Sequence, residues 1–533
     1  MVSMRAALRR GFDRVERGLD LVFGTDWNPM AHLGSLGWFL FWIVVVTGIY
    51  LFIFFDTGVK AAYDSVKWLS TDHWWHAGVA RSLHRYASDL MVVMMFTHLI
   101  REFAMDRYRG TRWFSWVTGV PVIWFVYLSG ITGYWLVWDE LAQYVALTTS
   151  ELLDTLGIFG EPIARNFLSP ATLSDRFFTL MVFLHIAIPL LLLLLMWIHI
   201  QRITQARTNP PTGLAAMTLA ALVAGSLISP APLQGPADLA TVPQRLDLDW
   251  FLLSLYPVIE AVPAGVIWAC VVAFTALLVG MPWLPPRSYG RPAEVFLDHC
   301  NGCERCVNDC PYNAITLEPR SDGAPFRFEV EVIPTRCVAC GICMGSCPSS
   351  SPFRRTGGLI TGIDLPDYSL ADLRTRVIEA ADGQPGDTGR GRVLTLACNH
   401  GAGSRPALGR VNVPCVAMVP PSIVDFIISR GLADGVCIAG CAARECQNRL
   451  GREWTQLRFA RQRDPYLRAR VPRERVMMIW AGPTEEARLA VELDGFAARL
   501  AKLPVYEKIR PMEESELASS QTNSGAKKLS PAK

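Results

Sequence analysis

Four histidines in the first half of the chain stand in two pairs with the same spacing. His84 and His98 are 14 residues apart in one apolar stretch, and His185 and His199 are 14 residues apart in another. Fourteen residues of α-helix rise about 21 Å and return to within about 40° of the same face. Two such helices side by side would form two stacked histidine pairs within a membrane about 30 Å thick. The spacing therefore predicts bis-histidine ligation of two haems.

The composition is typical of a membrane protein that also carries soluble domains. Hydrophobic residues make up 51% of the 533 residues, and the mean hydropathy is +0.25. Six segments are long and apolar enough to cross a membrane. They are approximately 33–55, 77–100, 116–137, 177–200, 213–231 and 263–284. Basic residues gather at the N-terminus and in the loops after the second and fourth segments, so we expect both termini to be cytoplasmic.

The N-terminus is predicted to be a surface helix. Residues 1–20 contain five arginines, and Leu8, Phe12, Val15 and Leu19 recur at helical spacing. This pattern predicts an amphipathic helix on the membrane surface, with a merely solvated helix as the alternative. No cleavable signal peptide is expected. The net charge of +3 is nearly balanced, and we expect no nucleic-acid partner.

Four glycines repeat the spacing of the histidines. Gly34 and Gly48 lie in the first segment and Gly119 and Gly133 in the third, again 14 residues apart. A flat macrocycle of haem size needs close approach to backbone, which glycine permits. We therefore predict that these glycines contact haem, with small-residue helix packing as the alternative.

With these residues, about 20–285 resembles cytochrome b of the cytochrome bc complexes. The resemblance includes Arg81, Arg101 and the stretch TGYWLVWDE at 132–140. It implies that both arginines neighbour haem propionates, and by analogy it suggests a homodimer. It also implies the pairing of the ligands. The outer, low-potential haem takes His84 and His185, and the inner, high-potential haem takes His98 and His199.

The resemblance extends to the quinol-oxidising loop, where that family carries a PEWY motif. The matching residues here are Leu248, Asp249, Trp250 and Phe251. Asp249 and Trp250 are predicted as catalytic residues, because a carboxylate can exchange a proton with a quinol hydroxyl. An exposed loop acid without a role is the alternative for Asp249. The family's last two helices and a Rieske-type partner are not recognisable in this sequence.

Eight cysteines form two copies of C-x2-C-x2-C-x3-C-P between residues 294 and 353. This resembles a two-cluster bacterial ferredoxin, in which the fourth cysteine of each run ligates the other cluster. One 4Fe-4S cluster is then expected on Cys300, Cys303, Cys306 and Cys347 and the other on Cys337, Cys340, Cys343 and Cys310. Structural zinc is the alternative. Since 13 of the 14 cysteines follow residue 299 in clusters, metal ligation in a reducing compartment is favoured over disulfides.

A second soluble domain is predicted from residue 391. Strands are expected at 393–398 and 435–440, and helices at 422–431 and 485–503. Their order predicts a small α/β unit with a mainly parallel sheet. Residues 356–390 are expected to be a linker with one helix near 369–381, and residues 506–533 a disordered tail.

The stretch GLADGVCIAGCAARECQNRLG within 391–505 resembles the iron–sulfur delta subunit of methyl-viologen-reducing hydrogenase. The resemblance implies one 2Fe-2S cluster and docking beside a heterodisulfide-reductase-type flavoprotein. The implied ligands are Cys398, Cys415, Cys441 and Cys446. The sequence departs from that family's pattern at two places. Asn399 follows Cys398 where the family has a second cysteine, and Gln447 follows Cys446 where the family has histidine. Cys437 is expected to be a buried apolar residue, and the alternative is that all five are buried free thiols.

The predicted fold is multidomain. An α-helical transmembrane bundle (1–285) is followed by an α+β ferredoxin-like domain (286–355), the linker, and the small α/β domain (391–505). The predicted function is a multi-pass subunit of a quinone oxidoreductase in a bacterial inner membrane. It would pass electrons between a cytoplasmic flavoprotein, which carries FAD and acts on NAD(P)H or a heterodisulfide, and the quinone pool.

The chain has no G-x-G-x-x-G after a strand, so hydride chemistry is assigned to that partner. Two alternatives remain at this point. One is a bc-type quinol-oxidising core with a separate Rieske protein, and the other is a membrane-tethered redox sensor.

Overall fold

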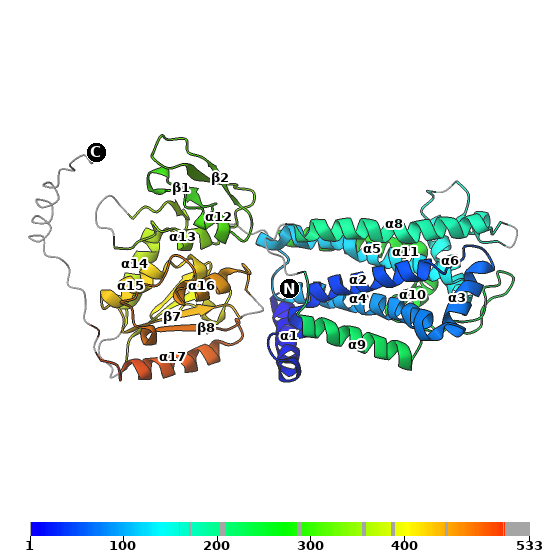
Figure 1. The fold of residues 1–533 in the computed structure, drawn as a ribbon, viewed down its shortest axis with the longest axis horizontal. Coiled ribbons are helices and arrows are strands. Elements are labelled where there is room, and N and C mark those ends of the chain that lie inside the picture. The colour runs from blue at the N-terminus through cyan, green and yellow to red at the C-terminus, as the bar shows by residue number, and fades with distance from the viewer. Residues whose placement is uncertain are drawn as a thin grey trace, which may run out of the picture. The chain divides into compact units, whose positions relative to one another are not determined.

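The computed structural model divides into two compact units, residues 1–288 and 289–533 (Figure 1). It describes residues 2–158, 160–169, 172–201, 208–284, 290–353, 359–384, 390–442, 446–504 and 506. The described part of the first unit is helical, and the described strands belong to the second.

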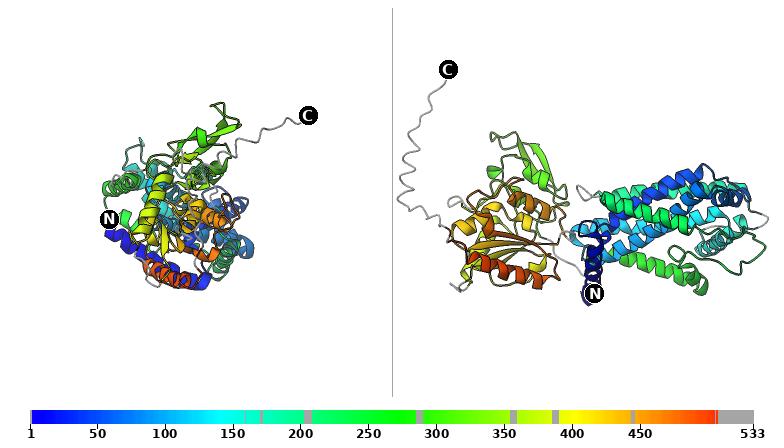
Figure 2. Two further views of the ribbon diagram at one scale, coloured as in Figure 1. Left: turned by 90° about the vertical axis from the view of Figure 1, so that its left-hand side faces the viewer. Right: turned by 60° about the horizontal axis from the view of Figure 1, so that its bottom comes forward.

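The first unit is a bundle of long apolar helices joined by shorter ones. Its helices are α1 (Val2–Phe23), α2 (Leu33–Phe52), α3 (Ala61–Thr71), α4 (Val79–Ala104), α5 (Trp113–Val137), α6 (Glu140–Asp154), α7 (Ile163–Phe167), α8 (Asp175–Ile200), α9 (Thr212–Ile228), α10 (Tyr256–Ala261) and α11 (Ala264–Gly280). Helix α2 packs along α4, and α5 packs along α8. Figures 1 and 2 show these helices running along one another.

Four stretches of the described residues are long and apolar enough to cross a membrane: Leu33–Phe52, Trp113–Val137, Asp175–Ile200 and Ala264–Trp283. The six predicted spans are therefore not confirmed as a set. Helix α4 has 26 residues but carries Arg81, Arg85 and Asp89, which lower its hydropathy. Helix α9 is apolar but only 17 residues long.

Helix α1 is held against the C-terminal end of α4 by ion pairs. Arg101 Nε donates to Glu16 Oε1 at 2.8 Å, and both side chains are buried. Arg5 and Asp106 form a second pair at 2.7 Å. The predicted N-terminal helix is thus present, and part of its polar face is covered by protein. Its place on a membrane surface stays a prediction.

The first part of the second unit contains two small antiparallel sheets. Strand β2 (Ile315–Pro319) pairs with β3 (Phe328–Val332), and β1 (Glu294–Val295) pairs with β4 (Ile363–Asp364). Two short helices, α12 (Arg305–Asp309) and α13 (Ile342–Ser346), lie in the two cysteine runs. Each ends one residue before the last cysteine of its run.

The second part is a four-stranded parallel sheet in the order β6-β5-β7-β8, which confirms the predicted sheet type. The strands are β5 (Val393–Cys398), β6 (Arg410–Val413), β7 (Gly435–Gly440) and β8 (Val476–Trp480). The helices are α14 (Leu370–Asp382), α15 (Pro421–Ser429), α16 (Gly451–Phe459) and α17 (Glu486–Leu500). Helix α17 covers one face of the sheet, and α14 and α15 cover the other (Figure 1).

The predicted linker at 356–390 differs from the structure. Within it, β4 pairs with β1, and Leu370, Leu373 and Val377 of α14 are buried in the core. That core is shared by the cysteine runs and the parallel sheet, so the two parts form one body. Apart from Tyr506, the predicted tail at 506–533 lies outside the described residues.

Candidate functional site

Helices α4 and α8 bring the predicted histidine pairs together. The ring centroids of His84 and His185 are 6.4 Å apart. His98 and His199 lie close enough to interact electrostatically. Two metal–imidazole bonds of about 2 Å each, with the inner radii of two rings, span about 6 Å. The separation of His84 and His185 therefore fits one metal atom between two imidazoles.

Each predicted glycine faces one of these histidines from a neighbouring helix. A Cβ atom added to the glycine would stand close to the Cε1 atom of the imidazole. The separations would be 3.5 Å for Gly34 and His98, 3.0 Å for Gly48 and His84, 3.1 Å for Gly119 and His199, and 2.8 Å for Gly133 and His185. The glycines of α2 thus contact the histidines of α4, and the glycines of α5 contact those of α8. The bare backbone at these positions lets each imidazole approach the neighbouring helix this closely.

Three threonines that sequence reasoning missed orient the rings. Thr47 Oγ1 lies 3.1 Å from His84 Nδ1, and Thr132 Oγ1 and Thr118 Oγ1 lie 3.2 Å from Nδ1 of His185 and His199. Each threonine also donates to a carbonyl one turn earlier in its own helix. An imidazole that donates through Nδ1 presents Nε2 to a metal. The available signal was that each threonine directly precedes a predicted glycine.

The two arginines expected near haem propionates have different surroundings. Arg81 donates to the carbonyl oxygens of Ala231 and Pro232 at 2.9 and 2.8 Å, so it holds the segment after α9. Arg101 pairs with Glu16, yet its Nη2 is buried without a hydrogen-bond partner in the described residues. An unsatisfied buried guanidinium nitrogen is costly. A propionate carboxylate would satisfy it, so Arg101 suits that role better than Arg81.

Asp249, the predicted catalytic carboxylate, is only 4% exposed, unlike the loop acid of the alternative. It accepts hydrogen bonds from Tyr134 Oη of α5 and from the Phe251 amide at 2.8 Å. Burial alone would raise its pKa, but hydrogen bonds from Asp89, Tyr134 and Phe251 hold the pKa below its usual value. Trp250, the other predicted catalytic residue, is 68% exposed.

Sequence reasoning missed Asp89, which lies in α4 five residues after His84. Its carboxyl group lies close enough to that of Asp249 for the two to interact. Two ionised carboxylates have no proton donor, so a hydrogen bond between them would need one of the two to be protonated. The guanidinium of Arg85 lies 5.6 Å from the centre of the Tyr134 ring beside them. A carboxyl group in an apolar helix was the available signal, because such residues are costly and usually functional.

The eight cysteines of the first soluble part lie near one another, and their assignment to two clusters stays a prediction. Cys306 interacts electrostatically with Cys300, Cys303 and Cys347. Cys340 interacts with Cys310 and Cys337, and Cys343 interacts with these three and also with Cys306 of the other predicted set. Burial raises the pKa of the Cys340 thiol to about 12. Iron must then displace that proton on binding. In the described part of the chain, no group of three or more His, Cys, Asp or Glu side chains stands in the arrangement that a single metal ion requires.

Four of the five later cysteines gather at the carboxyl edge of the parallel sheet. Cys398 Sγ lies 3.3 Å from Cys441 Sγ, and Cys446 interacts electrostatically with Cys415 and Cys441. Side chains that follow parallel strands meet at this edge. Cys437 is fully buried on the opposite face of β7, where it packs in the cluster that includes Leu489 of α17. Cys398 and Cys441 belong to a different buried cluster, so Cys437 lies apart from the group of four.

Three parts of the chain match known families. Residues 20–207 match cytochrome b/b6/petB. Residues 299–351 match the 4Fe-4S dicluster domain, and residues 393–504 match the delta subunit of methyl-viologen-reducing hydrogenase. A solved structure described as "Hyperthermophilic respiratory Complex III" is 20% identical, with a TM-score of 0.36. The match covers 47% of this chain and 74% of that one.

Proposed function

We propose, for a chain that carries a cytochrome b/b6 domain, a 4Fe-4S dicluster domain and a hydrogenase delta-subunit domain, that it is the electron-transfer subunit of a membrane quinone oxidoreductase. The cytochrome b family and the apolar helices mark an integral membrane protein, and these families imply haem b and 4Fe-4S clusters. The finer proposal is transfer between a cytoplasmic flavoprotein and membrane quinone. Two b haems, two 4Fe-4S clusters and one 2Fe-2S cluster supply the one-electron chemistry.

One observation carries this proposal: each of the four histidines faces glycine backbone from a neighbouring helix. His84 with His185, and His98 with His199, are the proposed axial ligands. Thr47, Thr118 and Thr132 orient three of the rings. The histidines of α4 require that helix to lie in the bilayer, so we include α4 among the proposed spans. We also include α9, which is a shorter apolar helix.

The test is spectroscopic and kinetic. The purified chain in detergent is expected to show a reducible b-type spectrum, and an added quinone is expected to reoxidise it repeatedly when an artificial donor is supplied. A redox sensor would not sustain this turnover. Absence of b-type absorbance from the purified polypeptide would overturn the proposal. The flavoprotein is tested separately: the chain alone should not oxidise NADH or NADPH, whereas the native complex should.

The proposed quinone site is the carboxyl pair Asp89–Asp249. Quinone reduction takes up two protons with two electrons, and quinol oxidation releases them, so the site needs a group that exchanges protons. The two carboxyl groups lie close enough to share one proton, and Tyr134 donates to Asp249. Leu252 packs against Gly130 of α5, which holds this loop against the bundle.

Asp249→Asn is expected to slow quinone-linked turnover by about 10²–10⁴-fold, the usual contribution of a positioned proton-transfer group. Asp89→Asn should slow it in the same assay, because the pair loses its shared proton. Turnover is followed as quinone-dependent reoxidation of the haems. Asp247→Asn, at an exposed position two residues earlier, is the matched control and should turn over normally. Unchanged rates in both Asp249→Asn and Asp89→Asn would exclude the pair.

Gly48→Ala is expected to lower the haem content of the chain by about one haem, since the new methyl would stand 3.0 Å from His84 Cε1. Room for the macrocycle would be lost at that site, because core positions tolerate little added volume. The matched control is Gly37→Ala in the same helix, where no atom lies within 4 Å of the added Cβ. Haem per polypeptide, measured as the pyridine haemochrome, decides the result. Equal haem content in the two variants would contradict it.

A further inference from the structure

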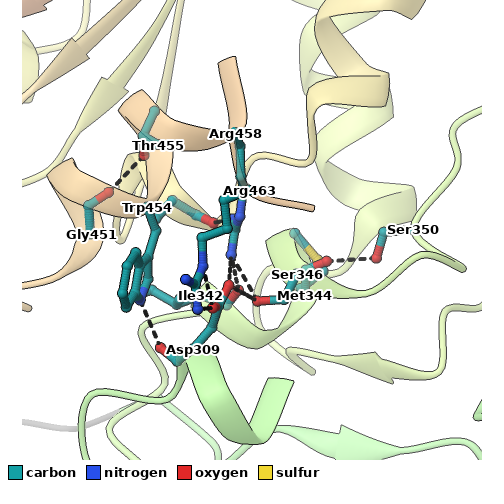
Figure 3. A network of polar contacts seen from close by, with 11 residues as sticks. Asp309, Ile342, Met344, Ser346, Ser350, Gly451, Trp454, Thr455, Arg458 and Arg463 are labelled. Carbon is teal, nitrogen blue, oxygen red and sulfur yellow. Dashed lines mark hydrogen bonds and ion pairs between the residues drawn. The ribbon is translucent and has the colours of Figure 1, made fainter. Parts of the chain in front are cut away.

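The guanidinium of Arg458 joins three segments that each carry a proposed cluster ligand. Arg458 belongs to α16 and is 1% exposed. Its Nη1 donates to Ala417 O at 2.7 Å, and its Nη2 donates to Ser346 Oγ at 2.7 Å and to Asp309 Oδ2 (Figure 3). Together Arg458, Asp309, Ser346 and Ala417 form what we call the Arg458 bridge.

The bridge residues stand beside ligands of all three proposed clusters. Asp309 directly precedes Cys310, Ser346 directly precedes Cys347, and Ala417 follows Cys415 by two residues. Cys310 and Cys347 belong to the two different 4Fe-4S sets, and Cys415 belongs to the 2Fe-2S set. The buried Arg458 side chain therefore contacts residues that lie within two positions of a ligand of each of the three proposed clusters.

Steric contacts hold the same segments close together. A Cβ atom added to Gly345 would stand 2.0 Å from Ala417 O and 2.7 Å from Arg458 Nη1. Cys340 packs against the buried cluster that contains Cys415. The 4Fe-4S set with Cys340 is thus the one adjacent to the 2Fe-2S set, and the bridge spans the boundary between them.

Together with Arg463, the bridge places a net positive charge at this boundary. Asp309 forms ion pairs with both Arg458 and Arg463, so two cations share one carboxylate. Trp454 Nε1 donates to Asp309 O at 3.2 Å, and Arg463 lies over the Trp454 ring at 3.6 Å. A buried charge is screened weakly. The reduction potential of an iron–sulfur cluster depends on nearby charge and hydrogen bonding.

We propose that the Arg458 bridge fixes the separation of the three clusters and, together with Arg463, raises the reduction potential of the 4Fe-4S cluster held by Cys310, Cys337, Cys340 and Cys343. This rests on the proposed ligand sets. A positive charge favours the reduced, more negative cluster, so removing it makes reduction harder. A unit charge that lies one or two residues from a cluster ligand acts strongly on the cluster in a protein interior. Removing one such charge should therefore change the equilibrium constant for reduction of the cluster at least tenfold. A tenfold change corresponds to a shift of about 59 mV in the midpoint potential for one electron.

The test is a signed charge series on the full-length chain with its clusters. Arg458→Met removes one positive charge and should shift the midpoint potential downward. Asp309→Asn removes the negative charge and should shift it upward. The double variant restores the net charge of the unmodified chain and should return the potential close to its starting value. Potentials are read by redox titration with electron paramagnetic resonance, and Arg488→Met, at an ion pair on α17, is the charge-matched control.

A purely structural role gives a different pattern. It would lower the unfolding temperature without opposite shifts in the two single variants, and that result would overturn the proposal. If Arg458→Met fails to retain its clusters, the proposal is tested by Asp309→Asn alone, which should raise the midpoint potential. Arg458→Lys keeps the positive charge but loses the planar, forked set of guanidinium donors. This variant should leave the midpoint potential unchanged while altering the magnetic interaction between the reduced clusters. Failure of the unmodified chain to take up iron and sulfide would instead refute the proposed function.

Discussion

Replacing His84 with leucine is expected to leave each chain with one b haem instead of two. An imidazole supplies each axial bond, and leucine cannot replace it. Because His84 faces His185 across 6.4 Å, His185→Leu should remove the same haem. His98→Leu should remove the other one. Potentiometric titration of the b-type absorbance separates the two haems, so each variant should lose one of two midpoints and about half of the amplitude.

The matched control for this prediction is His73→Leu. His73 lies outside both pairs, where its ring packs against Trp68. Both midpoints should remain in that variant. Loss of both haems from every variant, including the control, would indicate a general failure of folding. Loss of different haems from His84→Leu and His185→Leu would contradict the proposed pairing.

Replacing Cys441 with serine is expected to abolish the 2Fe-2S signal while both 4Fe-4S signals remain. Cys441 Sγ lies 3.3 Å from Cys398 Sγ at the carboxyl edge of the sheet, so it is central to the group of four. Serine is close in size to cysteine but does not supply the thiolate that binds iron. Electron paramagnetic resonance of the reduced protein, with iron and sulfide analysis, measures the result.

Cys437→Ser is the control, because Cys437 lies only four residues earlier but packs in a different buried cluster from Cys398 and Cys441. This variant should keep all three signals, although burying a hydroxyl in place of a thiol will cost some stability. If the unmodified chain shows no 2Fe-2S signal, the five later cysteines are free thiols, as in the alternative interpretation.

The contacts within the two units could be predicted where a spacing in the chain maps directly onto a regular element. The 14-residue repeats place His84 and His98 on one face of α4, and the glycines of α2 and α5 face the rings as expected. The first three cysteines of each run lie close together because their motif is local, and Cys306 also lies near Cys347 of the other run. The parallel sheet followed from the alternation of strands and helices, but the short strands β6 and β8 were missed.

Other features depend on contacts between residues that are far apart in the chain. Asp89 and Asp249 are separated by 160 residues, and no local pattern links them. Arg458 meets Asp309 from 149 residues away. The role of 359–384 as part of the core likewise arises only when α14 packs on the sheet.

By itself, the sequence determined which residue types recur at helical or motif spacing, and hence which histidines, glycines and cysteines were predicted to hold cofactors. The physical reason is that helix periodicity and short ligand loops are set by neighbouring residues. The tertiary structure alone decided which carboxyl group lies beside Asp249, and which cation bridges the cysteine segments. A buried polar group must find its partner in the folded interior, wherever that partner lies in the chain.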